Sequence, residues 1–360
     1  MARKITLVGG GTMGPTAPLL ALHDFLSKKN PRDKFIWVGT SEGPERKPVE
    51  TRGIPFETIP SAKVPRYLSP KLFTWPLDYL KARKASKAFL DKHKPDIVIG
   101  AGGFTQVPLI RAAAKQGIPC VVHQLDFQPG LSNLAVQKHC KFITTTFTYH
   151  YKKFGKCKNE KQIATPNRFA SLEIPEKKDA KAHFGFNNDT PVLLVIGGGT
   201  GSRALNHTTE KHIGKLLEKV QVLHVTGRGR SSNPSEQIGY KRFEFLDRDE
   251  LLQAYIAADI VISRAGMGGI TDLATLSKPT ILVPIPKTHQ EKNTRHLPIA
   301  TIEVKESNNL FDDLYKEVLR LLKDSDKRKK LAYELHRTVN TDNGQEWASI
   351  IERFLPEDLE

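Results

Sequence analysis

Two glycine-rich stretches decide the fold of this chain: Gly10-Gly11-Thr12-Met13-Gly14 and Gly197-Gly198-Gly199-Thr200-Gly201. Each follows a short apolar run, at residues 5–8 and 192–196, and each precedes a segment with helical character. Glycines in such a turn let backbone N–H groups approach a phosphate, and the following helix N-terminus adds positive potential. One such turn is weak evidence, because glycine turns also end ordinary parallel strands. Two of them, about half a chain apart, indicate two similar nucleotide-binding domains and favour a two-domain sugar-nucleotide enzyme.

Short apolar runs alternate with helical patterns around both turns. In the first half we expect strands at residues 5–8, 35–38, 97–99, 120–123 and 142–146, and helices at 17–28, 77–93, 109–116 and 131–139. In the second half we expect strands at residues 192–196, 222–226, 243–246, 260–263 and 280–284, and helices at 203–220, 250–257, 270–276, 310–323 and 345–354. This alternation predicts an α/β protein with parallel, doubly wound sheets, which bind ligands at the carboxyl ends of their strands. The polar residues 151–175 are the predicted linker.

The composition is typical of a globular protein. The 360 residues are enough for two domains with full cores. No apolar run reaches the roughly 18 residues that a membrane span needs. The three cysteines, Cys120, Cys140 and Cys157, are odd in number and lack metal-ligand spacing. They favour a reducing cytoplasm and predict no metal site.

The net charge of +16 predicts attraction to nucleic acid, anionic lipid or a phosphorylated substrate. The alternative for the charge alone is a generally basic, soluble surface. Residues 63–94 interleave nine Lys and Arg side chains with Phe73, Trp75 and several leucines. Such a mixture fits contact with an anionic membrane surface. The alternative is a packing segment whose apolar residues belong to the core. We expect no nucleic-acid partner, because no recognisable nucleic-acid-binding module accompanies the charge.

Three further motifs lie where parallel strands are expected to end. Residues 100–108 form another glycine turn, which by itself could be structural. His123 and Asp126 lie at the end of an expected strand, where the catalytic residues of parallel sheets usually lie. A lone histidine at this position is more often structural. Asp272 lies one turn into an expected helix after a glycine loop, where a carboxylate can accept both hydroxyls of a ribose. The alternative for Asp272 is simple charge complementarity with the helix N-terminus.

The order of these motifs resembles the MurG family of bacterial peptidoglycan glycosyltransferases. These enzymes move N-acetylglucosamine from UDP-N-acetylglucosamine to lipid I, the undecaprenyl-diphospho-muramoylpentapeptide, and so form lipid II. The resemblance covers nearly the whole chain, from Gly9 to about Asn293. The family motifs, among them G-x-G-G-[YF]-x-x-x-P and H-Q-x-x-N-A, match residues 10–18, 100–108, 123–133, 197–202, 263–272 and 289–294.

The resemblance implies a GT-B fold, with two Rossmann-like domains facing a cleft. It implies an N-terminal acceptor domain at residues 1–165, a UDP-sugar domain at 166–340, and a C-terminal helix, 341–360, that returns to the first domain. The implied donor and substrate contacts are Thr12, Met13, Gly14, Asp126, Arg168, Gly199, Thr200, Leu246, Arg264, Met267, Gly268, Gly269, Ile270, Thr271, Asp272, Gln290 and Asn293. The implied contacts of the acceptor diphosphate are Gly11, Thr12, Gly102 and Gly103.

Within that set, Asp272 would bind the ribose, Leu246 would lie beside the uracil, and Gln290 would lie near the sugar and diphosphate. The family uses no metal or other cofactor, because helix N-termini and backbone amides stabilise the departing diphosphate. Residues 63–94 would rest on the inner leaflet, which implies a peripheral protein on the cytoplasmic face of the cell membrane.

Several residues depart from the family pattern within the motifs. Pro15 replaces a histidine, and Asp272 replaces a glutamate, which shortens the side chain by one methylene. In the third motif, Gln124, Leu125 and Asp126 stand where the family has Glu, Gln and Asn. In the fourth motif, Gly199 and Thr200 stand where the family has Ser and Gln. A family arginine is displaced to Arg168. An inverting transfer needs a base for the acceptor hydroxyl. Since Pro15 cannot serve, Asp126 is the first candidate and His123 the second. Arg168 or Arg264 could neutralise phosphate, although Arg264 could instead be a structural tie.

Other functions stay open at this point. The chain could be a different GT-B enzyme, such as a glycolipid synthase or a UDP-N-acetylglucosamine 2-epimerase. It could also be a sugar-nucleotide-binding or membrane-scaffold protein without catalysis, which the loss of the histidine at Pro15 suggests. Donor turnover without an acceptor, and dependence of activity on lipid, would separate these possibilities.

Overall fold

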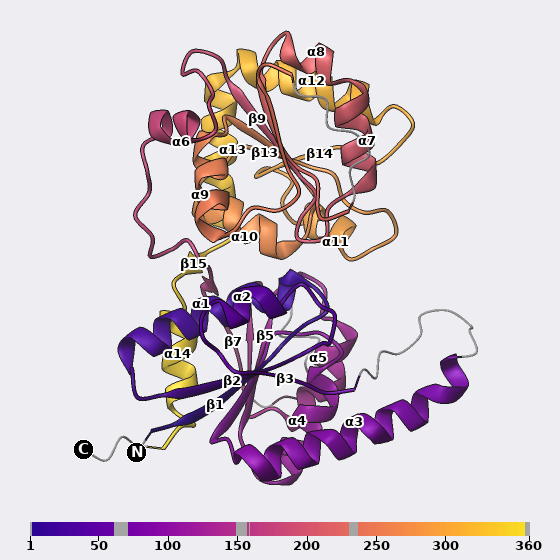
Figure 1. Cartoon of the computed structure of the whole chain (residues 1–360), viewed down its shortest axis with the longest axis vertical. Coiled ribbons are helices and arrows are strands. Elements are labelled where there is room, and N and C mark those ends of the chain that lie inside the picture. The colour runs from indigo at the N-terminus through magenta and orange to yellow at the C-terminus, as the bar shows by residue number, and fades with distance from the viewer. Residues whose placement is uncertain (1, 61–70, 149–156, 158, 230–236, 357–360) are drawn as a thin grey trace. The chain divides into compact units, whose positions relative to one another are not determined.

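The computed structural model describes residues 2–60, 71–148, 157, 159–229 and 237–356, without the side chains of residues 71–74. The chain divides into two compact units (Figure 1). Unit 1 comprises Met1–Arg168 and Asp342–Glu360, and unit 2 comprises Phe169–Thr341. The C-terminal residues therefore belong to the same unit as the N-terminus. Among the described residues, no helix combines the length and the apolar character needed to cross a membrane.

Unit 1 is built on a parallel sheet of seven strands in the order β3-β2-β1-β4-β5-β6-β7. The strands are β1 (Lys4–Val8), β2 (Lys34–Gly39), β3 (Phe56–Thr58), β4 (Ile97–Gly100), β5 (Cys120–Gln124), β6 (Phe142–Thr145) and β7 (Glu160–Gln162). The helices are α1 (Met13–Lys29), α2 (Arg46–Glu50), α3 (Lys71–His93), α4 (Gln106–Lys115), α5 (Leu131–Val136), the short 3-10 turn η1 (Gln137–His139) and α14 (Gln345–Glu352).

Unit 2 repeats this plan with a parallel sheet in the order β11-β10-β9-β12-β13-β14. The strands are β9 (Val192–Ile196), β10 (Gln221–Val225), β11 (Tyr240–Phe243), β12 (Ile260–Ser263), β13 (Thr280–Leu282) and β14 (Ile302–Glu303). The helices are α6 (Lys177–His183), α7 (Arg203–Lys211), α8 (Ile213–Leu217), α9 (Arg248–Ala257), α10 (Met267–Thr275), α11 (Gln290–Arg295), α12 (Leu310–Lys323) and α13 (Ser325–Thr338). Two short strands, β8 (Thr165–Pro166) and β15 (Thr341–Asp342), pair with each other near the boundary of the units.

The predicted pair of parallel, doubly wound sheets is confirmed, and the topology places both glycine-rich stretches. In unit 1 the strand order reverses at β1, which pairs with β2 on one side and β4 on the other. In unit 2 it reverses at β9, between β10 and β12. Ligands of open parallel sheets bind at such switch points, outside the carboxyl ends of the strands. Each glycine-rich stretch directly follows the switch strand of its own sheet.

Some local expectations were wrong. The helix expected at 203–220 is two helices, α7 and α8, because His212 adopts a non-helical φ of −118° and ψ of 18°. Strand β11 ends at Phe243, where the strand was expected to begin. The predicted linker at 151–175 contains β7 and β8, and its residues 151–156 and 158 lie outside the described part.

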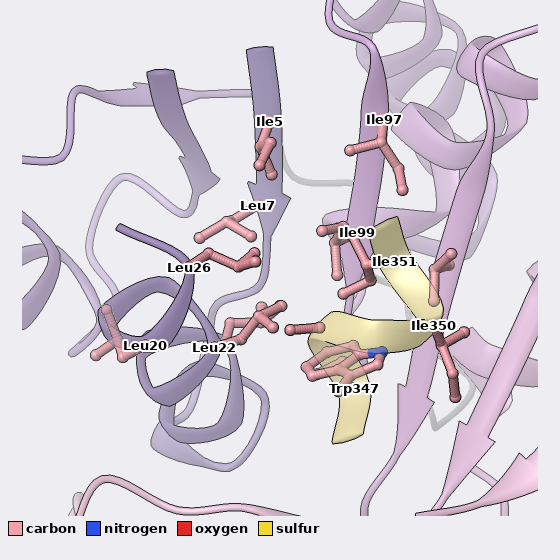
Figure 2. Packing of buried hydrophobic residues seen from close by; sticks show 14 of the residues in the cluster. Ile5, Leu7, Leu20, Leu22, Leu26, Ile97, Ile99, Trp347, Ile350 and Ile351 are labelled. Carbon is pink, nitrogen blue, oxygen red and sulfur yellow. The ribbon is translucent and has the colours of Figure 1, made fainter. Parts of the chain in front are cut away.

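Helix α14 completes the core of unit 1. Figure 2 shows Trp347, Ile350 and Ile351 of α14 beside Leu22 of α1 and Ile99 of β4, and these side chains share one buried cluster. The helix is also fixed at its start, because the Asp342 carboxylate accepts from the N–H groups of Gly344 (2.8 Å) and Glu346 (2.8 Å). The Glu346 carboxylate accepts in turn from the Ala164 N–H at 2.7 Å. Side chains between residues 347 and 355 therefore form part of the unit 1 core.

Candidate functional site

The two glycine turns of unit 1 pack backbone against backbone. Gly103 has a φ of +86°, and a Cβ at this position would lie 2.9 Å from the carbonyl oxygen of Gly10. A Cβ on Gly11 (φ +83°) would lie 3.0 Å from the ring of Phe104. Only glycine permits both the left-handed backbone and the close approach. The structure therefore brings together Gly11, Gly102 and Gly103 at the carboxyl edge of the sheet, next to Thr12, Met13 and Gly14 at the start of α1.

A buried carboxylate, Glu45, organises the first turn and was missed from the sequence. Its side chain is fully buried and accepts hydrogen bonds from the N–H of Gly11 (3.1 Å), the N–H of Thr40 (2.7 Å) and the hydroxyl of Thr40 (2.5 Å). The Gly11 N–H is thus already paired with a carboxylate. Thr12, the exposed N-cap residue of α1, has an extended backbone and no capping hydrogen bond from its side chain. Any anion at this turn would therefore meet the N–H groups at the start of α1.

The two candidate bases of the motif at residues 123–133, His123 and Asp126, lie in different surroundings. His123 is fully buried, with Nδ1 3.0 Å from the Thr144 hydroxyl and Nε2 3.3 Å from the Thr146 hydroxyl. Its ring centre lies 5.2 Å from that of Trp347. Asp126, in the loop after β5, is partly exposed. This geometry favours a structural role for His123, and leaves Asp126 as the carboxylate that solvent can reach.

The glycine turn of unit 2 is equally constrained. Gly201 has a φ of +70°, and a Cβ there would lie 2.0 Å from the carbonyl oxygen of Thr226 and 2.8 Å from the Cα of Gly227. Two consecutive strand-end turns, after β9 and after β10, therefore touch through their backbones. Ser202 begins α7 by accepting from the Leu205 N–H at 3.3 Å. Gly199 and Thr200 lie in this turn and are exposed.

Arg264 is a structural tie at the carboxyl edge of the unit 2 sheet. The guanidinium is buried and donates to the Ser202 hydroxyl (2.9 Å) and the Val283 carbonyl (3.1 Å). It also forms an ion pair with Glu306 at 2.6 Å. These contacts join the turn after β9, the end of β13 and the loop after β14. Its donors are used within the fold, which favours the structural reading over direct phosphate binding.

The loop after β12 and the start of α10 form the other part of the unit 2 site. Gly266 is the N-cap residue of α10, and Met267, Gly268, Gly269 and Ile270 form the first turn of that helix, followed by Thr271 and Asp272. Asn293 supports the loop by donating from Nδ2 to the Ala265 carbonyl at 3.0 Å. The amide nitrogen of Gln290 would lie 3.8 Å from a Cβ built on Gly266. Asp272 is buried in the second turn of α10.

The remaining predicted residues lie at strand ends or unit boundaries. Leu246 is buried between β11 and the capping residue Asp247 of α9. Its neighbour Phe245 is 43% exposed, and the Arg228 guanidinium lies 4.9 Å from the centre of the Phe245 ring. Arg168 is the last residue of the N-terminal part of unit 1. This pair was not singled out from the sequence, because an aromatic residue after a strand gives no signal by itself.

A buried histidine, His224 of β10, supports the unit 2 turns. Its Nε2 lies 3.1 Å from Asn206 Oδ1, so Nε2 carries the proton and Nδ1 accepts from the Tyr240 hydroxyl at 2.9 Å. Asn206 Nδ2 then donates to the Thr226 carbonyl at 2.9 Å, the group against which Gly201 packs. Burial, with a smaller contribution from the charge of Arg242, lowers the pKa of His224 from 6.5 to about 3.

This histidine makes the stability of unit 2 depend on pH. Because the folded pKa is depressed, the unfolded chain binds the proton first, and the stability present above pH 6.5 is lost as the pH falls towards 3. Between pH 7.5 and pH 5 we expect a loss of about 2 kcal/mol from this group. Hydrogen exchange of the β10 amides measures it. The His224→Gln variant should lose this part of the pH dependence, while a variant of the exposed His183 should keep it; equal pH slopes in all three proteins would contradict the assignment.

Within the described ranges, no group of three or more His, Cys, Asp or Glu side chains is arranged as a metal site.

The comparisons with known proteins agree with this architecture. Residues 5–145 match the glycosyltransferase family 28 N-terminal domain, and residues 192–349 match the family 28 C-terminal domain. The UDP-N-acetylglucosamine–N-acetylmuramyl-(pentapeptide) pyrophosphoryl-undecaprenol N-acetylglucosamine transferase of Clostridium botulinum (strain Langeland) is 37% identical over 288 residues, 79% of each chain. The transferase of the same name from Clostridium kluyveri is 34% identical over 339 residues, 94% of each chain.

Solved structures show the same fold. The crystal structure of Acinetobacter baumannii MurG matches with a TM-score of 0.71 at 20% identity, over 98% of this chain and 99% of the other. The glycosyltransferase SnogD from Streptomyces nogalater matches with a TM-score of 0.68 at 13% identity, over 98% and 100%. At these identities the structures establish the GT-B fold alone, and the sequence relatives establish the family. The chain therefore belongs to the MurG family of N-acetylglucosamine transferases, within glycosyltransferase family 28.

Proposed function

We propose that this protein is an inverting glycosyltransferase that moves N-acetylglucosamine from UDP-N-acetylglucosamine to lipid I and forms lipid II for the cell wall. The proposal rests on the glycine turns that follow the switch strands β1 and β9. These turns lie in a chain that is more than a third identical to an N-acetylglucosamine transferase with this activity in its name. The resemblance of all six motifs, in order, supports the same donor and acceptor. UDP-N-acetylglucosamine is a substrate of the reaction, and we propose no cofactor.

We assign the donor to unit 2. The start of α10 would receive the diphosphate, because the first N–H groups of a helix are unpaired and its dipole favours an anion. Asp272 would accept the ribose hydroxyls, and Gln290, beside Gly266, would contact the sugar. Leu246 would lie beside the uracil. Gly199 and Thr200 are assigned to the phosphates, while Arg264 would act through the loops that it ties together. Arg168, which directly precedes unit 2 in the chain, is a further candidate for phosphate contact.

We assign the acceptor to unit 1, with Asp126 as the base. The Asp126 carboxylate would take the proton of the acceptor hydroxyl as its oxygen attacks the anomeric carbon of the donor sugar. The new C–O bond forms while the bond to the UDP oxygen breaks, and UDP leaves with that electron pair. Helix N-termini and turn amides would stabilise the departing charge. The acceptor diphosphate would lie beside the turns at Gly11–Thr12 and Gly102–Gly103, where the N–H groups at the start of α1 would contact it.

We further propose that α3 attaches the protein to the cytoplasmic face of the cell membrane. Leu77 (61% exposed) and Leu80 (54% exposed) lie on an exposed stripe of α3 that continues with Lys81 and Lys84. Exposed leucines followed by lysines suit the boundary between acyl chains and anionic headgroups. Helix α3 is fixed to α4, because Arg111 of α4 donates to the hydroxyl of Tyr79 in α3 at 3.0 Å. The basic residues predicted at Lys63 and Arg66 lie outside the described residues.

Replacing both leucines tests this surface. Leu77→Asp with Leu80→Asp should weaken binding to anionic vesicles by about tenfold or more, since two partly inserted apolar side chains become charged. Flotation with vesicles of phosphatidylglycerol and neutral lipid measures the effect. Tyr333→Asp, at a 63% exposed aromatic residue of α13, is the control and should bind as the unaltered protein does. Unchanged binding of the double variant would remove α3 from the membrane surface.

The function itself is tested with a panel of acceptors. Purified protein and labelled UDP-N-acetylglucosamine are mixed with a lipid I analogue, with diacylglycerol, or with no acceptor. The proposal expects label only in the lipid I product. Transfer to diacylglycerol would indicate a glycolipid synthase. Donor turnover without an acceptor would indicate an epimerase, and donor binding without any turnover would indicate a binding protein.

A further inference from the structure

Three buried side-chain amides link the two loops of unit 1 that carry the proposed acceptor contacts. Gln106 lies at the start of α4, Asn133 lies in α5, and Gln124 ends β5; all three are almost fully buried. Here they are called the amide network. None of them is among the residues assigned above to donor, acceptor or base. Buried amides are costly unless they are hydrogen-bonded, so their arrangement is informative.

The hydrogen bonds of the amide network run in one direction. The Gly102 N–H donates to Gln106 Oε1 at 3.0 Å, and Gln106 Nε2 donates to Asn133 Oδ1 at 2.5 Å. Asn133 Nδ2 then donates to Gln124 Oε1 at 2.6 Å. Each amide accepts through oxygen and donates through nitrogen, so successive bonds polarise and strengthen one another. The network therefore begins at the second glycine turn, on a residue with a φ of +112°.

The network ends on the loop that carries Asp126. Gln124 Nε2 donates to the main-chain carbonyls of Asp126 (2.8 Å) and Gln128 (3.2 Å). Gln124 Oε1 also accepts from the Gly130 N–H at 3.3 Å. This loop lies between β5 and α5 and has no regular secondary structure. A single side chain thus contacts the loop at three points, and its amide group supplies both the donor and the acceptor that these contacts need.

We propose that Gln124 is a positioning residue for the transfer reaction, and that through Asn133 and Gln106 it fixes the Asp126 loop relative to the Gly102 turn. This inference rests on the proposed function, because it takes the Asp126 loop and the Gly102 turn as the acceptor side of the reaction. A base must lie within hydrogen-bond reach of the hydroxyl that it deprotonates, and displacements of about 1 Å can lower rates by about 100-fold. A glutamate at position 124 would keep the acceptor oxygen and lose both donors.

The test uses the full chain with Gln106→Met, Gln124→Met and the double variant. Each single substitution should lower kcat for lipid I glycosylation by about 10- to 100-fold, as the loss of supporting contacts does elsewhere, with the KM for UDP-N-acetylglucosamine within about twofold. The double variant should lose little more than the worse single variant, because both substitutions interrupt one network. Gln137→Met is the matched control, since Gln137 is another buried glutamine of unit 1 that donates to a main-chain carbonyl, that of Leu134.

Hydrogen exchange keeps the outcomes distinct. In Gln124→Met, the Gly130 N–H should exchange at least about tenfold faster, and the amides of β1 should be unchanged. The proposal would be overturned if Gln124→Met showed normal exchange at Gly130 and a kcat equal to that of Gln137→Met. It would also be overturned if the fold-losses in kcat of the two single variants multiplied in the double variant. If the unaltered chain does not glycosylate lipid I, the proposed function fails by itself. Hydrogen exchange then still tests the positioning claim, because unchanged exchange at Gly130 in Gln124→Met would show that Gln124 does not fix the Asp126 loop.

Discussion

Asp126→Asn is expected to lower kcat by about 10²- to 10⁴-fold, the usual contribution of a general base. Asparagine keeps the size of the side chain and removes its ability to take a proton. The fold of the loop should survive, because Gln124 binds the main-chain carbonyl of residue 126 and not its side chain. Donor binding should also survive, since the donor is assigned to unit 2. Initial rates with a lipid I analogue, together with calorimetric titration of UDP-N-acetylglucosamine, measure both effects.

Asp91→Asn is the matched control for this variant. Asp91 is exposed on α3 of the same unit, where it accepts from Gln116 Nε2 at 2.8 Å, and it takes no part in the proposed site. Its kcat should equal that of the unaltered protein. If Asp126→Asn turned over within about threefold of Asp91→Asn, the base would have to be another group. His123 is a poor substitute, because both of its ring nitrogens already lie against threonine hydroxyls in the core.

Trp347→Ala is expected to lower the free energy of unfolding of unit 1 by about 3–5 kcal/mol, the cost of truncating a large buried aromatic side chain. Trp347 is among the largest fully buried side chains of the chain, and it packs with Leu22, Ile99 and Ile351 in the cluster of Figure 2. Its removal leaves a cavity that the surrounding helix and strands cannot fill. Urea unfolding followed by tryptophan fluorescence reports on unit 1 selectively, because all three tryptophans, at positions 37, 75 and 347, belong to it.

Trp347→Phe separates packing from hydrogen bonding. Within the described residues, the indole N–H of Trp347 is buried without a hydrogen-bond partner, so phenylalanine removes an unsatisfied donor along with part of the ring. Its cost should therefore be clearly smaller than that of alanine. If Trp347→Ala cost less than about 1 kcal/mol, α14 would not be an integral part of the unit 1 core, and the role given to the C-terminal residues would be wrong.

The sequence predicted the sheets well where strands are apolar on both faces. Residues 192–196 and 260–263 were predicted at the bounds that β9 and β12 have, because buried parallel strands are continuous apolar runs. The short edge strands β3, Phe56–Thr58, and β7, Glu160–Gln162, were not predicted, since they contain polar residues and only three positions each. Helix α13, Ser325–Thr338, was also missed, because a charged surface helix buries little apolar area.

The candidate site was predictable in its glycines and not in the polar groups that support them. Gly103 and Gly201 stand in turns whose close contacts exclude a side chain, so the requirement is visible in the residue itself. Glu45 and Gln106 support the Gly11 and Gly102 turns of unit 1 through side-chain hydrogen bonds. Glu45 lies outside the motifs, and the motif at residues 100–108 does not specify the residue at position 106. Arg264 shows the opposite case, because it lies in a recognisable motif and uses its donors for structure.

The most direct test of an inverting transfer to lipid I is the anomeric configuration of the product made from UDP-α-N-acetylglucosamine and a lipid I analogue. Proton NMR determines it after transfer on anionic vesicles. We expect a disaccharide product with the β linkage, formed by one displacement with Asp126 as the base. An α-linked product would contradict the single displacement. Bound donor with no disaccharide product would contradict the assignment of lipid I as the acceptor.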